Sequence, residues 1–197
     1  MIQIELAKNS RYTLSEMAQM AIEGGCGWLV VAREAAADSV RDLAADLVPL
    51  CREAGTILSV ENDAAAAKEL EAHGVFITDG ADAAALREQL GPEAIIGVRI
   101  GAAATAVALE KADIDYVTLP REVDAEHAAG IIADARTGGA KIAFAAERNA
   151  ADMTDENIAG DLAAGFAGFY VKADIFDCDD PAARIGALRE TVENMEV

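Results

Sequence analysis

Basic residues follow several of the short apolar runs of this chain. The six cases are Lys8, Arg33, Arg99, Arg121, Arg148 and Lys172. They stand out because the chain has only 16 Lys and Arg against 35 Asp and Glu, which gives a formal net charge of −19. Cations gathered in an otherwise acidic protein favour a small anionic ligand, such as a phosphate or diphosphate. We therefore expect Arg121, Arg148 and Lys172 to bind phosphate.

Carboxylates follow two neighbouring apolar runs. Glu61 and Asp63 come after one run, and Asp79 and Asp82 come after the next. Mg2+ is typically held by one or two carboxylates together with the phosphate oxygens of a ligand, so Asp63 and Asp82 are candidate Mg2+ ligands. A second interpretation stays open, because Asp63, Asp82 and Asp124 each precede a predicted helix, where Asp is a favoured N-cap. The arginines could likewise do no more than neutralise these acids.

The elements that must position these residues repeat along the chain. Six glycine turns each precede a short apolar run, as expected where a helix ends and a buried strand begins. With two further runs the predicted strands cover residues 2–6, 27–32, 56–60, 75–78, 95–100, 114–119, 141–145 and 167–171. An Ala-rich, helix-forming stretch follows each strand. Units of about 25 residues predict a compact (β/α)8 TIM barrel, with residues 1–197 as one domain.

A doubly wound open sheet is the competing α/β fold. It accounts less well for eight consecutive units, and the glycine-rich fingerprint that usually follows its first strand is missing from this sequence. Thr13 and Glu16 form a capping-box pattern, and Asp180 precedes Pro181 at the start of the last predicted helix. In a TIM barrel the chemistry lies at the carboxyl ends of the strands, which is where the basic and acidic residues above are expected to meet.

Composition excludes several classes of function. The charge of −19 argues against nucleic acid or an anionic membrane as a partner. The sequence shows no secretory signal and no apolar run of the roughly 18 residues that a membrane helix needs. Its 3 cysteines are widely spaced, as expected for reduced thiols, so we expect a cytoplasmic protein. The partner expected is a small phosphorylated ligand; a homodimer stays open, because the sequence does not decide the oligomeric state.

Several stretches, in consistent order, resemble one protein family. Residues 60–63 (VEND), 72–77 (AHGVFI) and Asp82 resemble the "IND…GADGVHLG…D" segment of thiamine phosphate synthases and their TenI relatives. The later matches are residues 95–98 (IIGV) with "IIG-S", 112–117 (ADIDYV) with "GADYV", and 165–181 with "GADGVAVVSAIF…DP". The resemblance runs from about Gly24 to the C-terminus and implies the same barrel.

The resemblance implies a reaction and a set of roles. The family joins an aminopyrimidine diphosphate to a thiazole phosphate and releases diphosphate, in thiamine biosynthesis. Loss of diphosphate leaves a pyrimidine carbocation, a step that needs Mg2+ and cations but no protein nucleophile. The resemblance places Mg2+ on Asp63 and Asp82 and a diphosphate contact on Asn62. Together with Arg33 and Arg99, Asn62 completes the expected catalytic set of a transferase.

The chain also departs from the family pattern. The pyrimidine-binding Gln is Val30, and of the surrounding Gln-x-Arg-x-Lys motif only Arg33 is basic. The Ser that ends the fifth strand is Arg99, and the Ser of the last strand is Lys172. The Gly-Gly phosphate turn is residues 145–146 (AA). Side-chain cations thus stand where the family uses backbone amides and small polar residues.

Three functions remain open on these grounds. The first is a divergent thiamine phosphate synthase whose substrate contacts have been rewritten. The second is a non-catalytic homologue that binds a phosphorylated ligand or has a regulatory role. The third, another phosphate-handling barrel enzyme, ranks last, because no Lys or His base is evident at a strand end.

Overall fold

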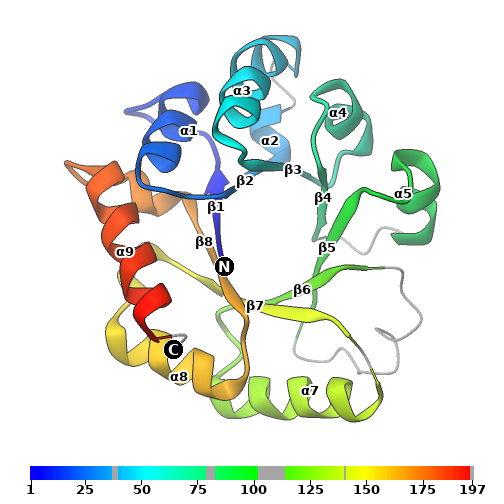
Figure 1. The fold of residues 1–197 in the computed structure, drawn as a ribbon, viewed down its shortest axis with the longest axis vertical. Helices are drawn as coiled ribbons and strands as arrows, with labels where there is room; N and C mark the ends of the chain where they lie inside the picture. The colour runs from blue at the N-terminus through cyan, green and yellow to red at the C-terminus, as the bar shows by residue number, and fades with distance from the viewer. Residues whose placement is uncertain (37–39, 79–82, 102–113, 140, 196–197) are drawn as a thin grey trace.

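The computed structural model describes residues 1–36, 40–78, 83–101, 114–139 and 141–195 (Figure 1). Eight parallel strands close into a barrel in sequence order, which confirms the predicted fold. The strands are β1 (Ile2–Leu6), β2 (Trp28–Val31), β3 (Ile57–Glu61), β4 (Gly74–Ile77), β5 (Ile95–Arg99), β6 (Tyr116–Leu119), β7 (Ala143–Arg148) and β8 (Gly168–Val171). Each is nearly continuous in apolar residues because helices cover its outer face.

Helices surround the barrel, as Figure 1 shows. They are α1 (Leu14–Glu23), α2 (Arg33–Ala36), α3 (Val40–Ala54), α4 (Ala64–Glu69), α5 (Ala83–Leu90), α7 (Ala125–Thr137), α8 (Asp155–Ala164) and α9 (Pro181–Met195). Two short 3-10 turns, η1 (Ala150–Asp152) and η2 (Ala173–Phe176), follow β7 and β8. The short helix expected after the fifth strand falls within residues 102–113, outside the described residues.

The predicted helix starts are confirmed by hydrogen bonds. Thr13 and Glu16 form the reciprocal capping box of α1. Asp63 accepts the amide hydrogen of Ala66, and Asp124 caps α7 in the same way. At the end of α8, Gly165 takes the left-handed backbone, with φ of 103°, that closes a helix before a strand. Local sequence therefore sets where these units begin and end.

An aromatic cluster fills the barrel interior. Trp28 and Tyr116 meet edge to face with ring centroids 5.1 Å apart, and Phe76 stacks on Tyr170 at 4.8 Å. Gly97 makes room for this cluster, because a Cβ at that position would lie 2.0 Å from the Tyr116 ring. Burial of these rings is a large hydrophobic contribution to the stability of the barrel.

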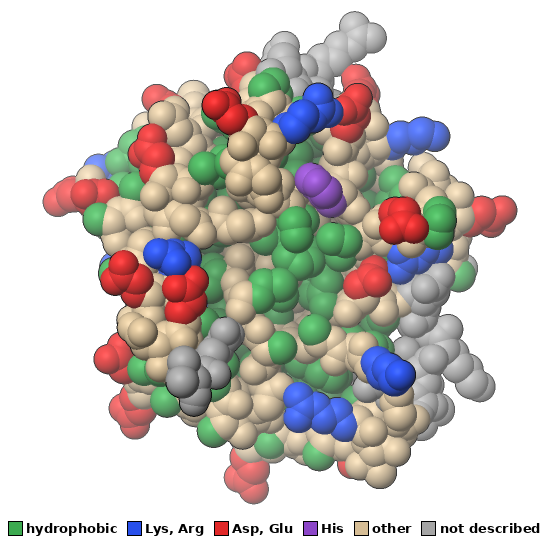
Figure 2. Space-filling model, in the orientation of Figure 1, with side chains coloured by type: hydrophobic (Ala, Val, Ile, Leu, Met, Phe, Trp, Pro, Cys, Tyr) green, Lys and Arg blue, Asp and Glu red, His purple; other side chains and the backbone are tan. Residues whose placement is uncertain are grey.

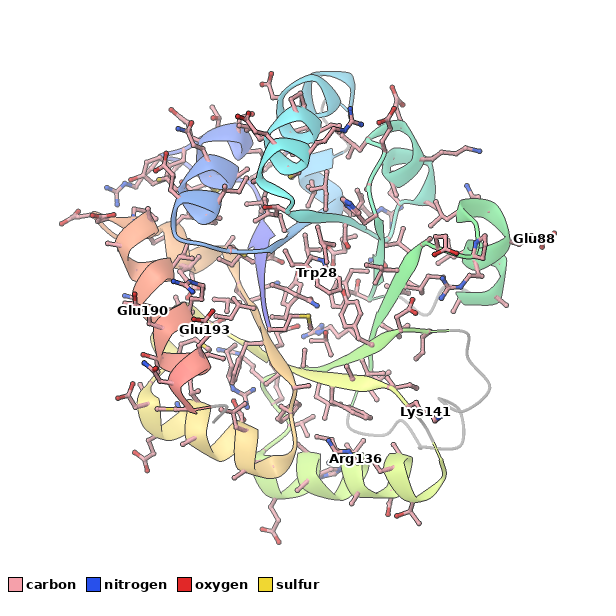
Figure 3. All side chains as sticks on the ribbon, in the orientation of Figure 1. Trp28, Glu88, Arg136, Lys141, Glu190 and Glu193 are labelled. Atoms are coloured by element: carbon pink, nitrogen blue, oxygen red, sulfur yellow. The ribbon has the colours of Figure 1, made fainter. Side chains whose placement is uncertain are left out.

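An apolar cavity opens at the amino ends of the strands. Figure 2 shows apolar side chains at the centre of this face with charged side chains around them, and Figure 3 labels Trp28 at the same place. The cavity has a volume of about 270 Å³ and is lined mainly by Met1, Ile2, Cys26, Trp28, Ile57, Ile185 and Val192. Because TIM barrels act at the opposite end, we assign this face to stability.

One strand differs from its prediction in a way that affects the site. The seventh strand was expected to end at Ala145, whereas β7 continues to Arg148. Residues 146–148 therefore follow the alternation of a strand, with neighbours pointing to opposite faces. Within the described residues, no helix has the length and apolar character needed to cross a membrane.

Candidate functional site

Five charged side chains meet inside the carboxyl end of the barrel, which we call the mouth. They are Glu5, Glu61, Arg99, Glu147 and Lys172, from or directly after β1, β3, β5, β7 and β8. The strand register brings them together: Glu147 lies beside Tyr170, and Arg99 beside Thr118. Three carboxylates face two cations, so the mouth is close to electrically balanced.

Lys172 pairs with Glu5 across the join between the first and last strands. The Lys172 ammonium donates to Glu5 Oε1, and the amide of Ala173 donates to Glu5 Oε2 at 3.1 Å. The Tyr170 hydroxyl lies 3.3 Å from the same carboxylate. The Glu5 side chain is only 8% exposed, so its charge is compensated inside the protein rather than by water.

Arg99 pairs with Glu147 from two strands away. Nη2 donates to Glu147 Oε1 at 2.9 Å, and Nε lies 2.8 Å from Oε2 with its N–H poorly aligned for a hydrogen bond. The side chain of Arg99 is 36% exposed while that of Glu147 is 7% exposed. The guanidinium therefore faces both its buried partner and the solvent above it. A cation in this position can contact an anion that enters the mouth.

The ends of β3 and β4 are tied together by polar side chains. Thr78 donates from Oγ1 to Glu61 Oε1 at 3.2 Å, and its amide donates to Asn62 Oδ1 at 2.7 Å. The amide of Arg33 donates to Glu61 Oε2 at 3.1 Å, which joins the end of β2 to the same network. Asn62 has φ of 50°, a left-handed conformation that Asn tolerates better than most residues. Asn62 is thus held rigidly at the edge of the mouth.

Tyr170 forms the floor of the mouth. Burial raises the pKa of its hydroxyl well above the usual value, and the nearby carboxylates, that of Glu5 first, raise it further. The hydroxyl therefore stays protonated and serves as a hydrogen-bond donor. The floor is neutral, aromatic and closed from below by the stacked ring of Phe76.

The proposed metal ligands are described only in part. Asp63 Oδ1 accepts the Ala66 amide hydrogen at 2.9 Å, so its capping role is established. Asp82 lies outside the described residues, as does Asp79. Within the described ranges, no group of three or more His, Cys, Asp or Glu could hold a metal by itself. The Asp63 carboxylate itself offers oxygen atoms, the type of donor that Mg2+ prefers.

Arg148 does not face the mouth, contrary to the sequence-based expectation. It donates to buried Asp161 of α8 through Nε at 2.9 Å and through Nη2 at 2.5 Å. Because β7 alternates, Glu147 points inward and Arg148 points outward. Burial raises the pKa of Asp161, and the hydrogen bonds and charge of Arg148 oppose that shift. Arg121 is exposed, pairs with its neighbour Glu122 and lines the same outer pocket as Arg148.

Two carboxylates of the mouth were missed by sequence reasoning. Glu5 was read only as part of an apolar strand, although it is the sole charged residue within Ile2–Leu6. Glu147 directly follows the AA pair that stands in place of the Gly-Gly turn, and the sequence predicts no role for it. A charged residue at an inward position of a parallel strand is the signal that could have identified both.

The chain is similar in sequence to thiamine-phosphate synthases. The profile of a family described as thiamine monophosphate synthase matches residues 4–121. A thiamine-phosphate synthase of Chromobacterium violaceum is 33% identical over 195 residues, covering 89% of this chain and 87% of the relative. One from Bacteroides thetaiotaomicron is 28% identical over 190 residues, covering 89% and 90%.

Solved structures give the same barrel. Thiamine phosphate pyrophosphorylase from Pyrococcus furiosus superposes with a TM-score of 0.81 at 20% identity, covering 98% of this chain and 96% of that one. Orotidine 5'-phosphate decarboxylase from Pyrococcus horikoshii superposes with a TM-score of 0.72 at 15% identity, covering 98% and 99%. At these identities the superpositions support the fold alone.

Proposed function

The chain belongs to the thiamine monophosphate synthase family, and on that premise we propose that it condenses an aminopyrimidine diphosphate with a thiazole phosphate. The observation that carries this proposal is that two partly exposed cations, Arg99 and Lys172, lie at the mouth of a family barrel. Departing diphosphate develops negative charge, and fixed cations in a partly buried site stabilise such charge strongly. A cytoplasmic location and a homodimer stay predictions of the sequence.

The residues of the mouth divide between charge stabilisation and positioning. Arg99 and Lys172 would contact the leaving diphosphate, with Asn62 and Arg33 at the edge formed by β2 and β3. The aromatic floor of Tyr170 and Phe76 offers a flat, dry surface for a substrate ring. No side chain needs to act as a nucleophile, because the bond to diphosphate breaks by ionisation.

Mg2+ is the metal that the family chemistry implies. Asp63 and Asp82 would hold it, and the oxygen donors at the end of β3 fit a hard cation. When bound, Mg2+ supplies positive charge that stabilises the leaving diphosphate. Of the two proposed ligands, Asp63 is described, and its carboxylate is oriented by the capping bond from the Ala66 amide.

The metal role of Asp63 is tested by a substitution that keeps the cap. Asn is as good an N-cap as Asp, so Asp63→Asn should leave stability nearly unchanged. It should lower turnover by about 10² to 10³, the usual loss for one such electrostatic contact. Asp124→Asn, at the N-cap of α7, is the matched control and should keep full activity. Equal activity in the two variants would remove Asp63 from the proposed metal site.

The reaction itself is tested with the purified chain, both substrate halves and MgCl2, with thiamine phosphate measured by chromatography. We expect turnover that Arg99→Met reduces strongly. Arg52→Met, which removes an exposed arginine paired with Glu71, should have no effect. Complementation of a thiamine auxotroph is the corresponding test in cells.

A non-catalytic homologue that binds a phosphorylated ligand is the second candidate. One observation favours it: both cations of the mouth already have a carboxylate partner within the protein. Binding of thiazole phosphate without condensation would support this candidate over the synthase. Condensation at an ordinary enzymatic rate would exclude it.

A further inference from the structure

Charges alternate in sign along one side of the mouth. From β5 to β1 the order is Arg99, Glu147, Lys172 and Glu5. Each cation is bound to a glutamate that is less than a tenth exposed, whereas Arg99 and Lys172 themselves are 36% and 35% exposed. Arg99 and Lys172 are therefore accessible to a ligand that enters the mouth, whereas the glutamates paired with them are buried. The resemblance to the family does not imply this alternation, because the family has Ser at the positions of Arg99 and Lys172.

An anion that binds Arg99 or Lys172 must compete with a carboxylate. If the anion draws one cation away, a buried glutamate loses its partner, and an uncompensated buried charge is strongly unfavourable. One phosphate offers a single group for this exchange. A diphosphate offers two linked groups and a higher charge, so it can engage both cations in one binding event.

We propose that Glu5 and Glu147 are specificity-determining residues that make the mouth select a diphosphate over a single phosphate. In the ligand-free protein the two glutamates hold the two cations. They therefore weaken the binding of any anion that engages only one of the cations. This inference rests on the proposed function, because it concerns the leaving diphosphate of that reaction.

The groups that surround these glutamates are consistent with the role. Glu5 contacts Lys172, Tyr170 and the amide of Ala173, all of which lie on or after β8. Glu147 has Arg99 on one side and Tyr170 as its register neighbour on the other. In the part of the chain that the structure describes, the ion pairs join Glu5 to Lys172 and Glu147 to Arg99, and the neutral Tyr170 lies between them.

The test is calorimetric titration with inorganic orthophosphate and inorganic diphosphate, without substrates. The wild-type chain should bind diphosphate at least tenfold more tightly than orthophosphate. Glu147→Gln and Glu5→Gln keep the shape of the side chain and remove the competing charge. Each should bind orthophosphate at least tenfold more tightly than wild type (about 1.4 kcal/mol), so that the discrimination shrinks.

Glu193→Gln is the matched control, because Glu193 pairs with Arg189 on the surface of α9, away from the barrel axis (Figure 3). It changes the net charge equally and should bind both anions as wild type does. The proposal is overturned if wild type binds the two anions equally or binds neither. It is also overturned if a folded Glu5 or Glu147 variant binds orthophosphate no better than wild type. Absence of condensation together with retained discrimination would count against the proposed function only.

Discussion

Breaking the ion pair between Arg148 and Asp161 should unfold the protein more readily without changing anion binding. The two side chains are 11% and 4% exposed, and Arg148 makes a two-point contact with the carboxylate. A third bond runs from Nη1 to the carbonyl of Glu147 at 2.8 Å. Removing one partner of a buried pair typically costs about 3–5 kcal/mol, because the other charge stays buried without compensation.

We therefore expect Arg148→Met to lower the free energy of unfolding by about 3 kcal/mol, the lower end of the range for such pairs. For a chain of this size that loss corresponds to about 6–12 °C in the melting temperature. Urea unfolding followed by the fluorescence of Trp28, the 1 tryptophan of the chain, measures the change. A double variant, Arg148→Met with Asp161→Leu, should recover most of the stability, because apolar side chains replace both charges.

Arg52→Met is the control, because Arg52 and Glu71 form a pair in which both side chains are about 70% exposed (71% and 69%). Loss of this exposed pair should change the free energy of unfolding by less than about 1 kcal/mol. The outward placement of Arg148 would be refuted if Arg148→Met weakened phosphate binding while leaving the unfolding midpoint unchanged. That pair of results would return Arg148 to the anion site that the sequence favoured.

Two further predictions concern the interior. Burial raises the pKa values of Cys26 and Cys51 to about 11. A thiol reagent at pH 8 should therefore label Cys178 fast in the native chain and all 3 cysteines after unfolding. Fast labelling of more than one thiol in the native chain would contradict this. Because these two pKa values are higher in the folded than in the unfolded chain, unfolding releases protons above pH 9, and the free energy of unfolding should fall as the pH rises from 9 toward 11. Gly97→Ala should destabilise the barrel by about 1–3 kcal/mol through the clash with Tyr116, and an unchanged melting temperature would show that the ring can shift.

Local sequence was enough to predict the barrel and its helix starts. Glycine turns, apolar runs and alanine-rich stretches each act over a few residues, and eight repeats of that pattern leave few alternatives to closure. Asp63 and Asp124 were predicted as N-caps for the same reason, since a cap bonds to an amide three residues away. Family membership was likewise evident from motifs in consistent order.

The pairing of charges was decided by tertiary structure. Whether a residue points into the barrel depends on whether its strand extends that far, because the alternation of inward and outward side chains holds only within the strand. The sequence ended the seventh strand at Ala145, so it could not show that Glu147 points inward and Arg148 outward. Glu5 and Lys172 are 167 positions apart and meet only because the first strand pairs with the last. Barrel closure is a property of the whole chain, and the contacts it creates have no local signal.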